Sequence, residues 1–489
     1  MHSYFKSFSF SILLLLVSTS ANTEIELPDL GNPSDIYMSK MEEPAIGRAY
    51  FRSLRAQRQV VEDALLTEYI QNLGEKLSSK VQSGDFDFKY FLVPQNSINA
   101  FAIPGGFIGI HTGLCINADN ESQLVSVLAH EISHVTQRHI SRQIGDQVPN
   151  SIQGGLVLLG AILLSAVTGS GEILEAGSAI IPSMMAQGKI DFTREMEIEA
   201  DAIGIKTMGL SGYDPYAMAD FFNKLSTGDD PRNAASIEFL RTHPTSVNRA
   251  SAAKKQARKM DVELVEESLG FELARARIRY LFGDTPEKTF TYFNNKTNKL
   301  NLNQPLTNRS IGELYGFALS SIDLGNLDQA EIILKKFSKE YSEFGHFHIA
   351  YIKLLIAKKM TSEAINYIKE RVLLSPRNIP ITLAYAETEL NYGSPKLSHE
   401  ILLDLFNNIP PTPPQIRLIA TSANRAGDIA DSFSYMAEYY LSIGNFKEAT
   451  EQLKIALSLK SLTKIQASKF IARLNEIEEY MLEMKRVNR

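Results

Sequence analysis

The sequence predicts an α+β fold that is mainly α: a domain with a small β-sheet, followed by an all-α solenoid. Alternating apolar and polar residues over 86–93 predict a strand, and β-like runs at 98–101 and 105–111 follow, separated by the turn Pro104-Gly105-Gly106. Apolar residues at helical spacing dominate the rest of the chain. Beyond about residue 305, similar helical segments recur at a fixed period, which indicates stacked helix pairs.

Composition limits the class of protein. The chain has 489 residues, more than one ordinary domain, and 44% of them are hydrophobic, enough for packed cores. The formal net charge of −6 argues against a nucleic-acid partner, because such binders normally carry a basic face. The single cysteine, Cys115, excludes an intrachain disulfide and a structural zinc site built from several cysteines.

The first 21 residues have the layout of a secretory signal peptide. A short segment with one lysine precedes the apolar run 9–17, and Thr19 and Ala21 occupy the small-residue positions before Asn22. The apolar run is short for a bilayer span, although an uncleaved anchor is the alternative. Export with one cysteine suits a Gram-negative periplasm, where disulfides are permitted but not required. An acidic, proline-containing lead-in is expected over 22–46.

Several helical segments are expected in the sheet-containing domain, which we place at 47–265. Helical periodicity begins near Gly47 and continues to Val81. A strongly apolar helix is expected over 124–140, with Asn120 or Asp119 as its N-cap.

An almost wholly apolar segment, 154–168, is followed by a second stretch rich in small residues, 176–187. One interpretation is a helical hairpin buried over the core. Another is a mobile apolar cover, or a membrane-contacting loop, near a functional site. A third is a membrane anchor at 154–168, although this run is shorter than the ~20 residues that a span needs.

The C-terminal region, 305–489, contains a repeated pattern, and a helical linker is expected over 266–304. The segment 325–330 (GNLDQA) is echoed by 444–449 (GNFKEA), and Ala330 and Ala364 stand 34 residues apart (364 − 330). This period, with Gly-Asn turns and alanines where helices touch, matches the tetratricopeptide repeat. The pattern is degenerate, so a non-repeating helical domain is the alternative.

The motif His130-Glu131-Ile132-Ser133-His134 carries the strongest chemical signal. Two histidines four residues apart on a helix share one face and can bind a single Zn²⁺, while Glu131 can act as general base on a water. A surface helix with two satisfied histidines is the structural alternative. It fits the apolar neighbours of the motif badly, because they predict a buried helix.

A catalytic zinc needs a third protein ligand. Glu197 and Asp201 are four residues apart and share a helix face, so Glu197 can complete the site while Asp201 accepts the outer N–H of a bound histidine, His130 by preference. An acidic helix N-terminus is the alternative. Glu195 and Glu199 rank below Glu197, since Glu199 lies on a different face.

The other histidines are sorted by position. His139 is nine residues beyond His130, which predicts the opposite side of the same helix. His111 is expected on a strand face rather than at a metal. His243 precedes a proline in a loop and could either stabilise an oxyanion or occupy the open zinc position.

These motifs together resemble the gluzincin zinc peptidases of the HtpX and CAAX-prenyl-protease group. The resemblance rests on His130-Glu131-x-x-His134, on Glu197-x-x-x-Asp201, and on Thr242-His243-Pro244 with Arg249. With the signal peptide and the repeats, it is closest to the periplasmic members of this group, and it covers nearly the whole mature chain.

The resemblance implies a gluzincin-type domain with one Zn²⁺ per chain, held by His130, His134 and Glu197. It implies that Asp201 supports a zinc ligand, that His243 is a switchable fourth ligand, and that Arg249 holds the His243 loop. It further implies that 154–187 shields the site or contacts the membrane. The repeat domain would bind the β-barrel assembly machinery or its clients, which are misfolded or stalled outer-membrane proteins.

The expected function is therefore that of a periplasmic zinc endopeptidase with chaperone-like activity. Glu131 and His243 are the expected catalytic residues. The alternative is a repeat-domain scaffold or chaperone with a structural or latent zinc site, because four protein ligands resemble a closed structural site.

Overall fold

The structure is a computed structural model that describes residues 43–81, 86–147, 192–226, 239, 243, 247–266, 268–460 and 462–487. The predicted signal peptide, most of the lead-in and the apolar segments at 154–168 and 176–187 lie outside the described residues.

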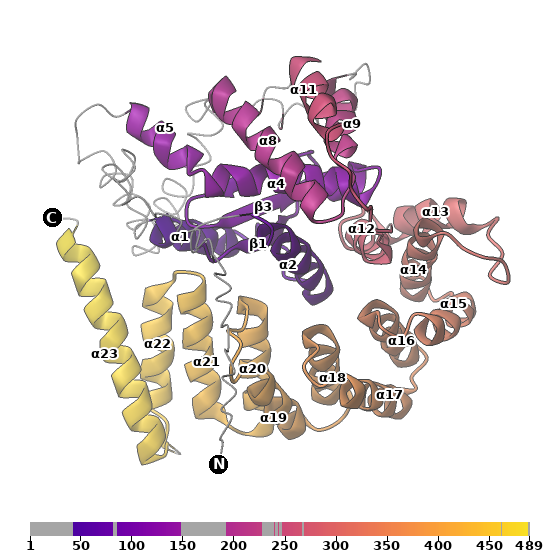
Figure 1. The fold of residues 1–489 in the computed structure, drawn as a ribbon. Coiled ribbons are helices and arrows are strands. Elements are labelled where there is room, and N and C mark those ends of the chain that lie inside the picture. Colours follow the sequence, from indigo (N-terminus) through magenta and orange to yellow (C-terminus); the bar gives the residue numbers. More distant parts are fainter. Residues whose placement is uncertain are drawn as a thin grey trace, which may run out of the picture.

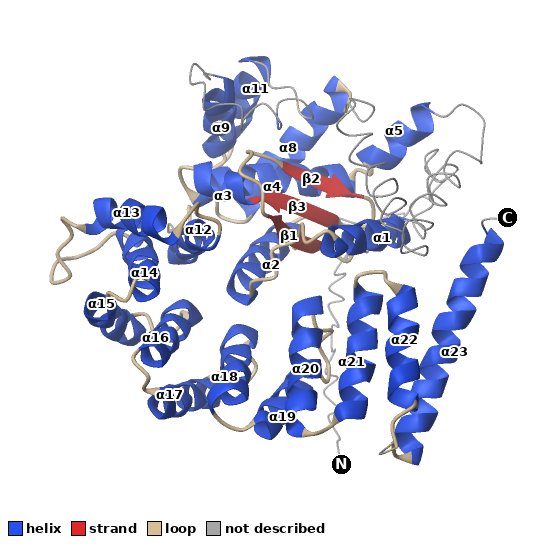
Figure 2. Ribbon diagram, turned by 180° about the vertical axis from the view of Figure 1, so that it is seen from behind, coloured by secondary structure: helices blue, strands red, loops and turns tan. Residues whose placement is uncertain are grey.

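Three short strands form the predicted sheet: β1 (Lys89–Val93), β2 (Ala100–Ile103) and β3 (Phe107–His111). The order is β1-β3-β2, with β3 parallel to β1 and antiparallel to β2. Figure 2 shows the strands side by side with helices around them. Gly105 and Gly106 adopt φ angles of 83° and 91°, which favour glycine, so the predicted β2–β3 turn is confirmed.

Both faces of the sheet are covered by helices. Successive strand residues point to opposite faces. Tyr90 and Leu92 belong to one core, shared with helices α2 (Ala64–Ser78) and α4 (Glu121–Thr136). Phe91 and Val93 belong to a second core on the other face, shared with α1 (Glu43–Ala56). This double cover explains why the strands are almost wholly buried.

The helical prediction for 47–81 is confirmed over most of the run, which forms two helices, α1 and α2. The chain leaves the helical conformation after Ala56, and Arg58 has φ 57°. Asp63 then caps α2, accepting a hydrogen bond from the Leu66 amide at 3.1 Å. The other helices described in this part of the chain are α3 (Thr112–Asn117), α5 (His139–Gln147), α8 (Arg194–Leu210), α9 (Tyr216–Ser226) and α11 (Val247–Ala257).

Helix α4 occupies the centre of this part of the molecule and packs against β2, β3, α8 and α9 (Figure 1). Asn120 is its N-cap as predicted, accepting from the Gln123 amide at 3.0 Å. Helix α8 approaches α4 closely at Gly204, where an added Cβ would lie 3.3 Å from the backbone nitrogen of His130. The close approach brings the acidic first half of α8 against the histidines of α4.

The predicted helix 124–140 ends early. Helix α4 stops at Thr136, Arg138 adopts φ 53°, and α5 starts in a new direction at His139. The buried carboxylate of Glu43 holds this corner, since it accepts hydrogen bonds from Arg138 Nε at 2.8 Å and from Ser141 Oγ at 2.5 Å.

In the C-terminal part, the regular elements that the structure describes are all helices, and they form an arc along one side of the sheet-containing part (Figure 1). Helices α16, α18 and α20 begin at Gly345, Ile379 and Pro413, so the spacing is 34 residues each time (379 − 345 and 413 − 379). The helices are α12 (Leu269–Leu281), α13 (Pro286–Thr297), α14 (Asn308–Asp323), α15 (Leu327–Glu340), α16 (Gly345–Ala357), α17 (Thr361–Leu374), α18 (Ile379–Tyr392), α19 (Pro395–Leu405), α20 (Pro413–Ala426), α21 (Ile429–Ser442), α22 (Phe446–Leu457) and α23 (Lys464–Val487).

Helix α12 joins the two parts. Phe271 and Ile278 on this helix belong to the sheet-containing core, whereas Leu273 belongs to the next helical core. Arg277 donates two hydrogen bonds to Asp63 of α2, at 2.7 and 2.6 Å, and a third to the Tyr315 hydroxyl of α14 at 3.0 Å. The mainly helical α+β fold is thus confirmed, while the exact domain limits stay a prediction. Within the described ranges, no helix combines the length and apolar character needed to cross a membrane.

Candidate metal centre

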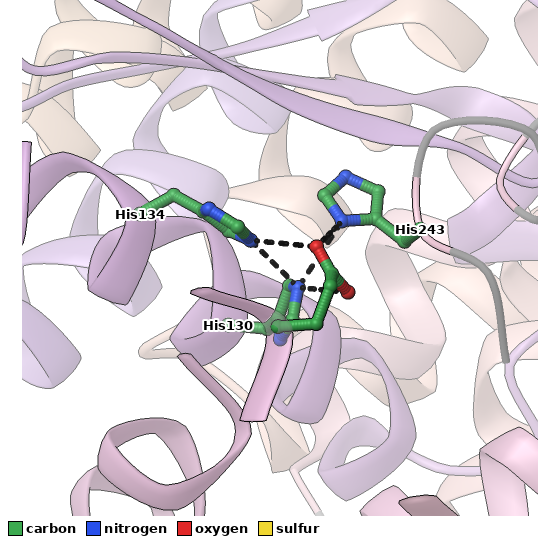
Figure 3. A group of neighbouring side chains, drawn as sticks. His130, His134 and His243 are labelled. Atoms are coloured by element: carbon green, nitrogen blue, oxygen red, sulfur yellow. Dashed lines mark hydrogen bonds and ion pairs between the residues drawn. The ribbon is translucent and has the colours of Figure 1, made fainter. Parts of the chain in front are cut away.

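Three histidines and a glutamate converge beside α4 (Figure 3). His130 and His134, one turn apart on this helix, have their Nε2 atoms 2.9 Å from each other. His243 Nδ1 lies 3.2 Å from His130 Nε2 and 2.9 Å from Oε1 of Glu197, which comes from α8. Glu197 is also 3.4 Å from His134 Nε2. The predicted ligands therefore meet at one point.

These four side chains suit a metal ion. One ligand atom from each lies within 4.8 Å of all the others, and all four residues are buried. Zinc–nitrogen bonds of ~2.0–2.1 Å in a tetrahedron place ligand atoms about 3.3 Å apart, close to the spacing found here. Nitrogen and carboxylate oxygen donors are also the set that zinc accepts. The four residues therefore fit a zinc ion.

Asp201 supports His130 from the side away from this group. Its Oδ1 lies 2.9 Å from His130 Nδ1, as predicted from the sequence. Arg249 donates to both Asp201 oxygens at 2.8 Å and lies 2.6 Å from Glu197 Oε2. Burial acts to raise the pKa of Asp201, but Arg249 and His130 outweigh it and lower the pKa. Asp201 is thus an ionised acceptor.

Glu131 points its carboxylate into the same interior. Among the described residues neither of its oxygens has a hydrogen bond of good geometry, and His243 Nε2 lies 3.4 Å from Oε1. Burial raises the pKa of Glu131 above its usual value. A buried carboxylate left in this state suits a proton-transfer role better than a structural one.

Two aromatic rings hold His243, and the sequence analysis missed both. Phe239 stacks on its imidazole with centroids 5.0 Å apart, and Phe192 stacks at 5.5 Å. The His243 amide donates a hydrogen bond to the Phe239 carbonyl at 2.8 Å. The spacing of four residues between Phe239 and His243 was the one sequence feature that could have indicated this contact.

The prediction for His139 is wrong. Instead of facing away, its Nδ1 lies 2.9 Å from Nδ1 of His134. The argument from spacing assumed one continuous helix, whereas the chain turns at Arg138 and brings His139 back. Glu199 does face away from the four-residue group as expected, but its Oε2 lies 3.1 Å from His139 Nε2.

His111 lies apart from the metal group. Its Nδ1 is 2.7 Å from the Ser97 hydroxyl, and its ring packs edge-on against Phe101. The strand-face interpretation agrees with these contacts.

Comparison with known proteins gives the family. The model of peptidase family M48 matches residues 64–257, the span that contains every residue of the metal group. A putative β-barrel assembly-enhancing protease of Vibrio cholerae is 32% identical over 470 residues, covering 94% of each chain. The chain belongs to peptidase family M48. It is accordingly a metalloendopeptidase.

Other relatives match this chain over different lengths. The β-barrel assembly-enhancing protease of Escherichia coli K12 is 31% identical over 464 residues, covering 94% of this chain and 92% of that one. The mitochondrial metalloendopeptidase OMA1 of Arabidopsis thaliana is 26% identical over 227 residues, 45% of this chain and 42% of its own. Similarity to the assembly-enhancing proteases thus continues through the helical C-terminal part of this M48 peptidase.

Proposed function

We propose that this M48 peptidase is a zinc-dependent endopeptidase of the periplasm with chaperone-like activity, which degrades or assists misassembled outer-membrane β-barrel proteins. The observation that carries the proposal is the convergence of His130, His134 and Glu197 around one point, beside the carboxylate of Glu131, which has no hydrogen bond of good geometry to the described residues. The names of relatives that match almost the whole chain support the substrate class.

In this proposal His130, His134 and Glu197 hold one zinc ion per chain. Three protein ligands leave a position for water or substrate, as a catalytic site requires. Bound zinc supplies Lewis acidity towards a peptide carbonyl and lowers the pKa of water. Asp201 fixes the ring of His130 through the contact at Nδ1, and Arg249 fixes Asp201 in turn.

Glu131 is the proposed general base. Its carboxylate takes a proton from the attacking water and later delivers that proton to the amine that leaves. The upward shift in the pKa of Glu131 suits both steps, because it makes the carboxylate a better proton acceptor than an exposed one.

His243 is proposed as a switchable group. In the described conformation its Nδ1 lies within the ligand group, which closes the site at rest. After it moves aside, an imidazole N–H can stabilise the oxyanion that forms on the peptide carbonyl. Arg249 is proposed to hold the loop that carries His243.

The remaining assignments extend to the whole chain. We place a signal peptide at 1–21, a lead-in at 22–46, the peptidase domain at 47–265, a linker at 266–304 and tetratricopeptide repeats at 305–489. The repeats would bind the β-barrel assembly machinery or its clients, and 154–187 would shield the site or contact a membrane surface. The 34-residue helix spacing supports the repeat assignment.

A second candidate is a scaffold or chaperone with a structural or latent zinc site. The observation that favours it is the position of His243, because four protein groups surround the proposed metal position. This candidate predicts that catalysis-dead variants keep their cellular role.

The Glu131→Gln variant tests the proposal, since it preserves shape and removes the base. We expect zinc content to be unchanged and cleavage of an unfolded barrel protein to fall by at least ~100-fold. Glu195→Gln, an exposed carboxylate on α8, is the matched control and should cleave like wild type. Cleavage by Glu131→Gln at the wild-type rate would rule out the proposed mechanism.

A further inference from the structure

We propose that His139 and Glu199 form a positioning relay that fixes the tautomer and orientation of the metal ligand His134. The relay runs from His134 Nδ1 to His139 Nδ1 at 2.9 Å, and from His139 Nε2 to Glu199 Oε2 at 3.1 Å. The inference rests on the proposed metal site, and it adds two residues that bind no metal themselves.

The direction of each hydrogen bond follows from proton counting. His134 directs Nε2 towards His130 and Glu197, so a bound metal takes the lone pair of Nε2. A neutral imidazole then carries its proton on Nδ1, which must be the donor. His139 Nδ1 is therefore the acceptor and holds a lone pair. The proton of His139 sits on Nε2 and is donated to the carboxylate of Glu199.

The surroundings hold the relay in place. His139 is fully buried, with a side-chain exposure of 0%, and Phe192 packs on the rings of both His134 and His139. The left-handed Arg138 turns the chain so that His139 faces back, and buried Glu43 anchors that turn. A contact built on a conformation that is unfavourable for arginine needs such support from its neighbours.

Glu199 is positioned from the other side of the site. It lies on α8, two residues beyond Glu197, so the helix that supplies a ligand also supplies the end of the relay. Arg142 of α5 donates to the same Glu199 oxygen at 3.2 Å. Glu199 keeps a side-chain exposure of 40%, and its Oε2 contacts both His139 and Arg142.

The two histidine ligands thus receive equivalent support. His130 is backed directly by Asp201, which is paired with Arg249. His134 is backed through His139 by Glu199, which is paired with Arg142. Each chain of contacts ends in an arginine–carboxylate pair, and each leaves the metal-facing nitrogen free of its proton. Such support typically changes metal affinity 10- to 100-fold.

The test measures metal binding rather than turnover. Zinc affinity is determined by chelator competition on the full mature chain, and the visible absorption of the Co²⁺-loaded protein reports ligand geometry. The variants are His139→Phe, which keeps a ring without nitrogens, and Glu199→Ala. Glu199→Gln keeps an oxygen acceptor for His139, and exposed Glu195→Ala is the matched control on the same helix.

We expect zinc affinity to fall ~10- to 100-fold in His139→Phe and less in Glu199→Ala, with altered Co²⁺ bands in both. Glu199→Gln should return towards wild type, and Glu195→Ala should equal it. If His139→Phe and Glu199→Ala keep wild-type zinc affinity and wild-type Co²⁺ spectra, the relay is overturned but the proposed function is not. An equal loss of zinc affinity in Glu195→Ala would also overturn the relay. If His139→Phe does not fold, the Glu199→Ala variant decides, because the Glu199 side chain is only partly buried. A wild-type chain that binds no zinc would instead overturn the proposed function and the relay together.

Discussion

The Asp201–Arg249 pair shows how single residues shape the site. Asp201 Oδ1 lies 2.9 Å from His130 Nδ1, and the carboxylate accepts two hydrogen bonds from Arg249; all three side chains are largely buried. In Asp201→Asn the volume stays but the charge that orients His130 is lost. We expect metal affinity to fall ~10- to 100-fold, measured by chelator competition. Asp220→Asn, an exposed carboxylate on α9, is the control, and equal affinities in both variants would contradict the assigned role.

Phe239 contributes at the same scale through its stacking on His243. Phe239→Leu keeps an apolar side chain but removes aromatic stacking worth about 0.5–1.5 kcal/mol. The closed position of His243 should become less favourable, so we expect cleavage of an unfolded barrel protein to rise by up to ~10-fold. Phe221→Leu is the control, since Phe221 contacts Phe239 and is equally buried. A rise of the same size in Phe221→Leu would show that loosened packing, not His243, is responsible.

Among the elements, α4 carries three of the residues named in the mechanism, and its N-terminus is capped by Asn120. Asn120→Ala removes the acceptor for the Gln123 amide, and we expect a loss of about 1 kcal/mol in the free energy of unfolding. Asn120→Asp keeps the acceptor and adds a charge that suits the helix N-terminus, so it should be at least as stable as wild type. Urea unfolding measures both, and equal losses in the two variants would contradict the capping role.

The same helix shows what the sequence can and cannot predict. The spacings within α4 and within α8 were sufficient to predict that His130 pairs with His134 and that Glu197 and Asp201 share a face. Those spacings refer to one regular helix, so they fail where the helix ends. The turn at Arg138 depends on Glu43, 95 residues away along the chain, and this contact has no local sequence signal. His139, Glu199 and the stacked Phe192 therefore required the structure.

For the whole molecule, the junction between the two parts depends on α2 and α12 together with the helices that pack on them. Arg277 ties Asp63 to Tyr315, and His346 of α16 packs edge-on against Tyr315. The sequence predicted a linker here without indicating that α12 shares its side chains between two cores. That arrangement depends on long-range packing, which periodicity does not encode.

Stability should depend on pH through His346 at this junction. Burial lowers the pKa of His346 to about 3, and the positive charge of Arg277 acts in the same direction. The unfolded chain, with an ordinary pKa near 6.5, binds the proton first as the pH falls. The contribution of the neutral His346 side chain to the free energy of unfolding is therefore complete above pH ~6.5. It is lost from there towards pH 3, by up to ~1.4 kcal/mol per pH unit.

His346→Leu removes this titration. We expect its urea midpoint, measured with chelator present, to fall less than that of wild type between pH 7 and pH 5. An identical fall in the two proteins would show that the imidazole of His346 does not titrate between the folded and unfolded states.

The central claim, a catalytic metal site closed by His243, is tested most directly by metal content in purified wild type and His243→Ala, with cleavage of an unfolded barrel protein measured in parallel. Zinc held by His130, His134 and Glu197 should remain at one ion per chain in both proteins, and cleavage should be raised or altered in the variant. Loss of zinc together with His243, or no metal in either protein, would contradict the claim and favour a structural site.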